Sequence, residues 1–593
     1  MENGKLEPQL ILALGVTENE RMSSEELNVG YDAAEKVWTL IIRYNGNGDN
    51  IREIAEDFSE LSGGYGIVRI EQTMIDALSE LENVIYIEKP KKLYYEIQDG
   101  ISASCVFYVQ NEPLNLFGEG VVVAVVDSGI DYLHPAFIDE YGKTRIIGIW
   151  DQTLSSEGEN TGQPPVGYNH GVWFTSEQID RAIEAAGTAG RQAAYNIVPS
   201  RDVSGHGTHV AGICCGNFAM DKRNNIGMAT KSKILVVKLG NPSGDGFPRT
   251  TELMEGMDFV VKKGIELNMP LVVNVSIGNA YGSHDGTSLL ETFMDLAADL
   301  GRTSVVVGSG NEGAEGGHVS GRFSGNITNE VRRTELIVGE YERSVNVQIW
   351  KSYEDIMSIE VISPSGMTTG MVRENPGIYR FNLDDMGLVI FFGEPSPYSR
   401  YQEIYLDFIT ENSFLPEGIW EIRLQGNNIV YGRYDMWLPV SNALGGNTEF
   451  IRPEPNITLT IPSTAAKVIT VGAYNAFTDS YADFSGRGYT RFTNQIKPDI
   501  VAPGVNVSSA SPGGGMDTRS GTSMATAFGS GAAALLMEWG IVRGNDSFLY
   551  GEKLKAYLIR GAQPVGTGRI DIFPRPNPLT GWGKLCVRAS LPV

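Results

Sequence analysis

The sequence predicts an α/β fold that is built on a doubly wound, mainly parallel sheet. Residues 121–126, 271–277 and 304–308 are apolar runs of strand length, which is typical of strands that are buried on both faces. Residues 251–267 and 288–300 are helix-like and separate these runs along the chain. Strands and helices that alternate in this way indicate βαβ units in a parallel sheet.

Three short strings place an acid, a base and a nucleophile on this scaffold. Asp127 ends the first apolar run in Val-Val-Asp-Ser-Gly-Ile, His206 opens a small apolar segment in Ser-Gly-His-Gly-Thr-His-Val-Ala-Gly, and Ser523 precedes small residues in Gly-Thr-Ser-Met-Ala-Thr. The carboxyl ends of parallel strands face the ligand crevice, so an Asp there can hold an imidazole. Taken singly, each residue has a structural alternative: a turn former, a buried structural His and a helix N-cap.

Together these strings resemble those of the subtilisin-like serine proteases, the subtilases. The resemblance implies a subtilisin-like sheet and a catalytic triad of Asp127, His206 and Ser523. It also implies that Asn311, in Gly-Ser-Gly-Asn-Glu-Gly after a buried strand, donates to the oxyanion together with the backbone N–H of Ser523. An Asn that follows Gly is otherwise a common turn residue.

The same resemblance indicates where a substrate would bind. Ser276, Ile277 and Gly278 match the edge beside which the substrate peptide lies as an added strand. Glu312 directly follows Asn311, so we expect it at the rim of the pocket for the side chain that precedes the scissile bond. A carboxylate at that rim would tolerate polar or basic side chains.

The composition of the chain changes along its 593 residues, which are enough for two to four domains. Residues 1–98 have their own pattern and resemble the subtilase prodomain, a folding chaperone that afterwards covers the active site; an unrelated N-terminal domain is the alternative. Residues 99–324 and 451–593 carry the catalytic motifs in two parts. Between them, residues 325–450 contain about eight short alternating runs and no convincing helix, which predicts an inserted β-sandwich or jelly roll.

The prodomain is expected to be an α+β sandwich that the enzyme removes from itself. Its end is extended and poor in helix formers, so we place the cut between Tyr94 and Ser102 and favour the bond Gln98–Asp99. The prodomain would then stay bound as an inhibitor. We expect strands at residues 10–16, 36–44, 65–70 and 84–88 and helices at residues 50–62 and 73–81.

The net charge of −25 limits the partners of the protein. It argues against nucleic acid or an anionic membrane and leaves a protein or peptide substrate. No run reaches the eighteen or so apolar residues of a membrane span. Acidic residues flank the apolar residues 10–16, which is unlike a secretory signal and predicts synthesis in the cytoplasm.

Cofactors and disulfides are not expected either. The four cysteines form no Cys-x-x-Cys pair and suggest no disulfide framework, which suits a reducing compartment. The triad needs no Lewis acid, and no cluster of His, Cys and Asp has the spacing of a zinc site. Many subtilases hold calcium through a carboxylate about nine residues beyond the catalytic Asp. Ala136 stands there, which predicts that this calcium site is absent.

The inserted domain, the lack of a signal-like segment and the string Tyr-Ile-Glu-Lys-Pro-Lys-Lys-Leu-Tyr at residues 86–94 resemble the Csp-type subtilases of clostridia. Members of that group act in spore germination by activating a cortex-lytic zymogen. The resemblance implies a spore-associated serine endopeptidase that makes limited cuts in protein substrates. The alternative is a non-catalytic sensor or scaffold on a protease fold, although this chain keeps all three triad residues.

Overall fold

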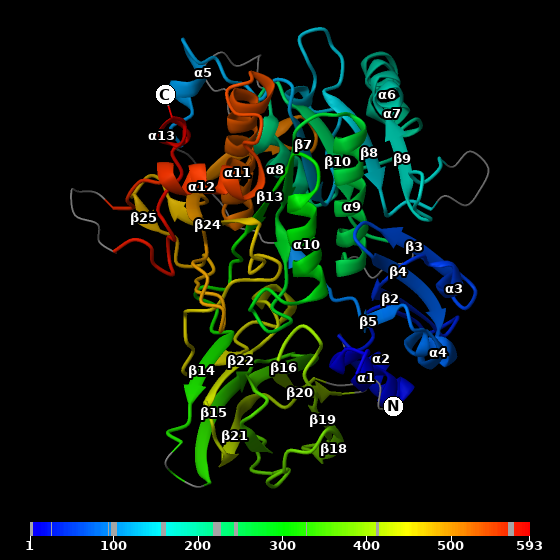
Figure 1. The fold of residues 1–593 in the computed structure, drawn as a ribbon, viewed down its shortest axis with the longest axis vertical. Coiled ribbons are helices and arrows are strands. Elements are labelled where there is room, and N and C mark those ends of the chain that lie inside the picture. Colours follow the sequence, from blue (N-terminus) through cyan, green and yellow to red (C-terminus); the bar gives the residue numbers. More distant parts are fainter. Residues whose placement is uncertain are drawn as a thin grey trace. The chain divides into compact units, whose positions relative to one another are not determined.

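The computed structural model divides the chain into two compact units, each assembled from segments that are far apart in sequence (Figure 1). Unit 1 comprises Met1–Tyr94, Asn279–Leu289 and Glu312–Ile461, and unit 2 comprises Tyr95–Gly278, Leu290–Asn311 and Pro462–Val593. The structure describes residues 4–24, 26–92, 94–95, 104–155, 162–217, 227–241, 247–325, 327, 329–410, 414–566 and 574–592.

Unit 2 is organised around a nine-stranded sheet in the described part of the chain, in the order β25-β24-β13-β11-β7-β10-β8-β9, with β26 also beside β24. The edge strands β9 and β25 are antiparallel to their neighbours, and the other pairings are parallel. This confirms the predicted doubly wound sheet. The strands are β7 (Val122–Asp127), β8 (Ile146–Asp151), β9 (Val172–Thr175), β10 (Lys233–Lys238), β11 (Leu271–Val275), β13 (Thr303–Gly308), β24 (Ile469–Asn475), β25 (Ser480–Tyr481) and β26 (Ile500–Pro503).

Helices cover both faces of this sheet. Val125 of β7 lies in one apolar cluster with Val210 of α8 (His206–Cys215) and Ala527 of α11 (Thr522–Met537). The next residue, Val126, faces α9 (Thr250–Glu266), where a Cβ added to Gly256 would lie 3.4 Å from its side chain. Because successive side chains of a strand point to opposite faces, α8 and α11 lie on one face and α9 on the other.

The helix α11 packs unusually closely because it is rich in small residues. All of its residues are buried, and a Cβ added to Gly531 would lie 2.2 Å from the side chain of Met228. Among the described helices, residues Thr522–Val542 are long and apolar enough to cross a membrane, but 83% of the tested window is buried inside the fold. Figure 1 shows α11 beside α8, as expected for a core helix of unit 2.

The remaining elements of unit 2 lie around this core. A hairpin pairs β27 (Val507–Ser511) with β28 (Gly515–Arg519), and a two-stranded sheet pairs β12 (Ile277–Gly278) with β6 (Tyr94–Tyr95), the strand at which the unit boundary falls. The other helices are α5 (Phe107–Gln110), η2 (Pro135–Phe137), α6 (Ser176–Ala189), α7 (Arg191–Tyr195), α10 (Leu289–Asp299), η4 (Glu538–Val542), α12 (Gly551–Gly561) and α13 (Val587–Ser590).

A disulfide joins Cys105 to Cys586 within unit 2, across 481 residues of chain. This differs from the expectation that the cysteines form no disulfide in a reducing compartment. Spacing along the sequence carried no sign of the pair, because the two residues meet only after the sheet and α13 have assembled. Cys214 and Cys215, by contrast, are free thiols buried in α8.

In unit 1, the first part of the chain forms a five-stranded antiparallel sheet in the described region, ordered β1-β2-β4-β3 with β5 beside β2. Strands at 36–44, 65–70 and 84–88 and the helix at 73–81 were predicted correctly. The strands are β1 (Tyr31–Asp32), β2 (Val37–Tyr44), β3 (Asp57–Leu61), β4 (Tyr65–Glu71) and β5 (Val84–Glu88), and the helices are α1 (Pro8–Gly15), α2 (Glu18–Ser23), α3 (Asp49–Arg52), η1 (Gln72–Met74) and α4 (Ile75–Glu80).

Two predictions for this region were wrong. The expected strand at residues 10–16 is the helix α1, which begins at Pro8 and buries Leu10, Leu12 and Ala13 against the sheet core. Pro fits the first turn of a helix, where its missing N–H is not needed. The expected helix at residues 50–62 is only the short α3, followed by β3, because pairing of β3 with β4 outweighs the local helical spacing.

The insert is a β-sandwich with a six-stranded sheet, β14-β22-β16-β20-β19-β18, and a four-stranded sheet, β17-β21-β15-β23, in the described residues. All eight predicted runs contain strands, and two more are added by β14, before residue 325, and by the short β23. The elements are β14 (His318–Arg322), β15 (Glu330–Val338), β16 (Ser344–Ser352), β17 (Ile356–Ile362), β18 (Gly377–Leu383), β19 (Met386–Phe392), β20 (Tyr401–Ile409), β21 (Gly418–Asn428), β22 (Arg433–Trp437), η3 (Ser441–Ala443) and β23 (Glu449–Phe450).

The insert and the N-terminal sheet share one hydrophobic core within unit 1. Phe391 and Tyr405, from β19 and β20, belong to the same buried cluster as Leu10 and Trp38. A set of buried charges accompanies this core: Lys91 forms ion pairs with Glu7 at 2.9 Å and with Glu88 at 2.8 Å. The two segments therefore form one compact unit, although more than two hundred residues separate them in sequence.

Candidate active site

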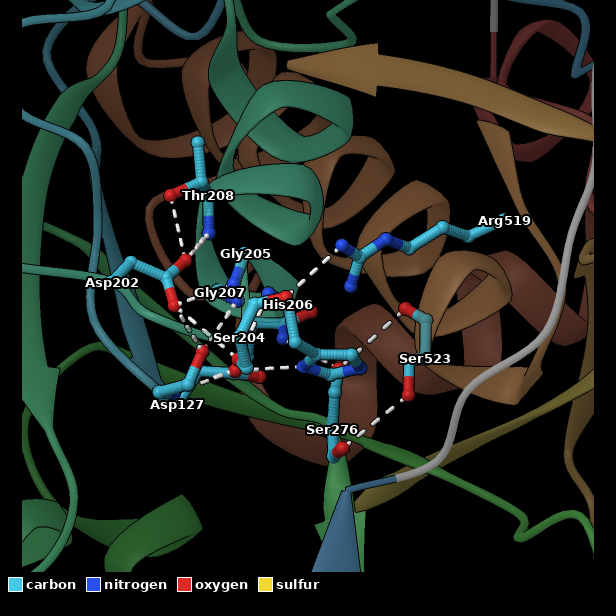
Figure 2. Close-up of polar contacts among 12 residues, drawn as sticks. Asp127, Asp202, Ser204, Gly205, His206, Gly207, Thr208, Ser276, Arg519 and Ser523 are labelled. Carbon is cyan, nitrogen blue, oxygen red and sulfur yellow. Dashed lines mark hydrogen bonds and ion pairs between the residues drawn. The ribbon is translucent and has the colours of Figure 1, made fainter. Parts of the chain in front are cut away.

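Asp127 and His206 meet at the carboxyl end of the sheet in unit 2. Asp127 is the last residue of β7, and His206 is the first residue of α8. The imidazole Nδ1 lies 2.7 Å from Oδ1 of Asp127, and both side chains are 0% exposed. Figure 2 shows the imidazole between this carboxylate and the side chain of Ser523. The sequence predicted that these residues would come together, and the fold places them in hydrogen-bonding contact.

The carboxylate of Asp127 controls the protonation of this histidine. Burial lowers the pKa of His206, but the negative charge of Asp127 and its hydrogen bond more than compensate, so the pKa is raised. Asp127 therefore stabilises an imidazolium that forms in a site without solvent. A general base that gains a proton during a reaction requires such a partner.

Ser523 is held at the start of the core helix. It is the second residue of α11, after the N-cap Gly521, and it is 0% exposed. Its Oγ donates to the backbone oxygen of Ser276 at 3.3 Å, and the Oγ of Ser276 donates to the backbone oxygen of Ser523 at 3.5 Å. At this helix position the backbone N–H has no carbonyl acceptor within the helix, so it can serve an oxyanion.

The predicted oxyanion residue Asn311 reaches the same helix terminus. Its Oδ1 accepts from the backbone N–H of Thr522 at 3.0 Å and from the Oγ1 of Thr522 at 3.2 Å. With its oxygen engaged in this way, Asn311 still has the NH2 group of its amide as a donor. We therefore expect Asn311 and the N–H of Ser523 to be the two donors to an oxyanion.

The predicted substrate edge is present as a strand. Ile277 and Gly278 form β12, which pairs with β6, and Ser276 is the buried residue before it. Glu312 lies in unit 1, where its two carboxylate oxygens accept from the backbone N–H and the Oγ of Ser441 at 2.9 and 3.3 Å. Gln98 and Asp99, the predicted cleavage bond, lie outside the described residues.

Sequence reasoning missed a second carboxylate behind the triad. Oδ1 of Asp202 accepts from Ser128 Oγ at 2.8 Å and from Gly205 N at 2.9 Å, and its Oδ2 accepts from Thr208 N at 2.8 Å. Ser128 Oγ in turn accepts from the N–H of Gly207 at 2.9 Å. Asp202 thereby ties the loop after β7 to the first turn of α8. Its place four residues before His206 was the available signal.

Arg519, at the end of β28, was also missed. Its positive charge lowers the pKa of His206, whereas the charge of Asp202 raises it. Arg519 stands four positions before Ser523, and no local pattern marks it.

The described residues contain no group of three His, Cys, Asp or Glu side chains that could hold a metal ion. Ala136, at the expected calcium position, lies buried in η2. The absence of the family's calcium site stays a prediction from the sequence.

The arrangement of Asp127, His206 and Ser523 defines a serine hydrolase of the triad type, and comparisons with known proteins agree. A model described as "Subtilase family" matches residues 118–375 and 442–583, and a second, "Csp protease B prodomain", matches residues 4–91. The first match covers more than half of the chain. The protein belongs to the subtilase family.

Relatives give the same result. The solved structure of the CspB protease of Clostridium perfringens is 37% identical in sequence, has a TM-score of 0.73 and covers 82% of this chain and 95% of that one. The minor extracellular protease Vpr of Bacillus subtilis is 22% identical over 78% of this chain and 50% of its own length. Subtilisin-like protease SBT3 of Solanum lycopersicum is 24% identical over 72% of this chain and 56% of its own. The chain therefore spans about half the length of these curated relatives.

Proposed function

We propose that this subtilase is an active serine endopeptidase that makes limited cuts in protein substrates. The observation that carries the proposal is the fully buried pair of Asp127 and His206, in which Oδ1 and Nδ1 are 2.7 Å apart. The imidazole of this pair lies beside Ser523 at the N-terminus of α11. A structural polar cluster would not need a nucleophile together with two donors for an oxyanion.

The reaction follows from these positions. Ser523 Oγ attacks the carbonyl carbon of the scissile bond while its proton moves to Nε2 of His206, and the oxyanion accepts from Asn311 and from the N–H of Ser523. The imidazolium, stabilised by Asp127, then gives that proton to the leaving amine as the C–N bond breaks. Water attacks the acyl-enzyme with His206 again as base, which releases the acid and restores Ser523.

We propose that the first substrate is the chain's own prodomain junction. The strand β6 ends three residues before Gln98 and pairs with β12, the edge expected to bind substrate. Ser276, the residue before β12, is hydrogen-bonded to Ser523, so this edge lies beside the nucleophile and a cut at Gln98–Asp99 is the favoured outcome. After the cut, the prodomain would stay bound as an inhibitor, because its core is continuous with that of the insert.

The finer proposal concerns the physiological substrate. The match to a Csp protease B prodomain and the likeness to the Clostridium perfringens protease support a role in spores, where the enzyme would activate the zymogen of a cortex-lytic enzyme. Incubation of the purified protein with such a pro-enzyme tests this role directly. A single new fragment supports it, and an uncut or degraded pro-enzyme contradicts it.

An active-site probe separates the protease from the alternative, a non-catalytic sensor or scaffold. A fluorophosphonate should label the purified full-length protein at Ser523, because only a hydroxyl activated by His206 reacts with it. Ser523→Ala is the control for labelling at other serines. Failure of the wild-type protein to label, also after removal of the prodomain, would overturn the proposed activity and favour the scaffold.

A further inference from the structure

Arg519 lies directly beside the catalytic histidine. It ends β28, four residues before Ser523, and is paired in register with Val507 of β27. Its Nη2 donates to the backbone oxygen of Ser204 at 3.1 Å, and its Nε donates to Oδ2 of Asp517 at 3.0 Å. The hairpin thus holds the guanidinium against the loop that leads into α8.

The backbone of α8 makes room for this side chain. Gly205, the N-cap of α8, has φ = 73°, and a Cβ added there would lie 2.9 Å from Nη2 of Arg519. Any other residue at this position would be strained by its φ and would also push the guanidinium away. The site therefore accommodates a cation immediately before His206.

The charge of Arg519 acts on its neighbours. Burial and, next to it, the charge of Arg519 lower the pKa of His209 to about 4. The pKa of His206 is raised overall by Asp127, but Arg519 opposes that effect. Asp517 neutralises the charge of Arg519 only in part, because it is 43% exposed and bonds to Nε alone. Nη1 of Arg519 bonds to no described residue. One edge of a guanidinium that is 13% exposed is thus open to a ligand.

The position of Arg519 corresponds to the leaving side of the reaction. Strand β6 lies N-terminal to the favoured cut and occupies β12, so residues before the scissile bond lie on that edge. The chain after the bond must leave past His206, which protonates its amine. In Figure 2, Ser276, which leads into β12, lies below His206 and Ser523. Arg519 lies above them.

We propose that Arg519 is a specificity residue that favours an acidic side chain immediately after the scissile bond. This inference rests on the proposed protease activity. The substrate class is then a protein loop with Asp or Glu as the first residue of the released segment. A guanidinium with one open edge forms a charge-assisted, two-point hydrogen bond with a substrate carboxylate. It forms no comparable bond with an amide or an ammonium group of a substrate.

The chain's own junction has this chemistry. In the favoured bond Gln98–Asp99 the first residue of the released segment is Asp99, and the next residues, Gly100 to Ser104, contain no basic side chain. The preference cannot come from the overall field of the protein, because a net charge of −25 repels acidic substrates at long range. It would have to come from a local cation, which Arg519 provides.

Cleavage-site profiling tests the inference with the full-length protein. A library of peptides of mixed sequence is digested, and the cuts are mapped by mass spectrometry for the wild type, Arg519→Gln, Arg519→Lys and Arg519→Glu. Arg560→Gln removes a charge from an exposed site on α12 and is the matched control. Fluorophosphonate labelling of each variant shows that the site is still assembled.

We expect Asp and Glu to be enriched roughly fivefold after the cut with the wild type and Arg560→Gln, and less with Arg519→Lys, which keeps the charge but cannot form the two-point bond. The enrichment should vanish in Arg519→Gln, and Lys and Arg should be favoured in Arg519→Glu. Cuts without acidic enrichment in the wild type, or enrichment that survives Arg519→Gln, would overturn the inference. No cuts at all by a wild type freed of its prodomain would instead contradict the proposed protease activity.

Discussion

Each unit contains a buried cluster of charged side chains, and the two clusters differ in the groups that these side chains contact. In unit 2, Asp127 and Asp202 surround His206 and the first turn of α8, and the cluster ends at Ser523. In unit 1, Lys91 is paired with Glu7 and Glu88. In the same region Glu403 accepts from Gln9 at 2.9 Å. Both clusters are removed from water, but only the first includes a nucleophile and oxyanion donors.

The comparison teaches that burial and perturbed charge do not by themselves define an active site. The unit 1 cluster joins the N-terminal segment to strand β20 of the insert, so its charges hold two segments of one core together. In unit 2 the carboxylates instead accept from a histidine and from backbone N–H groups that a reaction can use. The first cluster should therefore control stability and the second activity, and four predictions test this division.

The largest effect is expected from Ser523→Ala. Loss of the nucleophile should lower peptide hydrolysis by at least about a thousandfold. On a denaturing gel the wild type should run as fragments of roughly 100 and 500 residues, while the variant should run as one chain of 593 residues. If the variant, produced alone, is cut at the same bond, another protease processes the junction and the proposal of self-processing is wrong.

Lys91→Met should have the largest effect on stability. It leaves the buried carboxylates of Glu7 and Glu88 without their cation, and removal of one partner from a buried ion pair costs about 3–5 kcal/mol. Denaturant unfolding of unit 1, followed by tryptophan fluorescence, measures the change. Lys36→Met, at an exposed position in the turn before β2, is the control and should change little. Equal stability of the two variants would contradict the structural role of the cluster.

Glu403 should make the stability of unit 1 depend on pH. Burial raises its pKa from an ordinary 4.5 to about 7, so the folded state holds this proton more tightly than the unfolded state does. Its contribution is fully present below about pH 4.5 and is lost as the pH rises through 7, a difference of about 3 kcal/mol.

The test compares wild type with Glu403→Gln, which stays neutral at every pH. The unfolding free energy of the wild type, relative to that of the variant, should fall between pH 4.5 and pH 8. Parallel curves for the two proteins would show that Glu403 does not titrate in this range.

The smallest effect concerns the pH profile of the active site. The negative charge of Asp202 raises the pKa of His206, and activity requires the neutral imidazole. Asp202→Asn should therefore move the acidic limb of kcat/KM to lower pH. Glu552→Gln, an exposed acid on α12, is the control. If Asp202→Asn lowers kcat/KM but leaves the acidic limb of its pH profile at the same pH, Asp202 acts only by positioning the loop after β7.

The central strands of the catalytic sheet could be predicted from the sequence, whereas strand β8, the edge strands β9 and β25 and part of the N-terminal region could not. Buried parallel strands such as β7 are continuous apolar runs, so their type and place follow from local composition. The helix α1 is an equally apolar run, but its state depends on the sheet and on residues of the insert that it contacts. Local periodicity carries no information about those partners.

The sequence by itself predicted the parallel-sheet fold class, the triad residues and Asn311, because each follows from a short motif or an apolar run with its own local geometry. The tertiary structure alone decided that Cys105 meets Cys586, that the insert shares a core with the N-terminal sheet, and that Arg519 lies beside His206. These features depend on contacts between residues that are distant in sequence. Such contacts exist only once burial of the cores has brought the segments together.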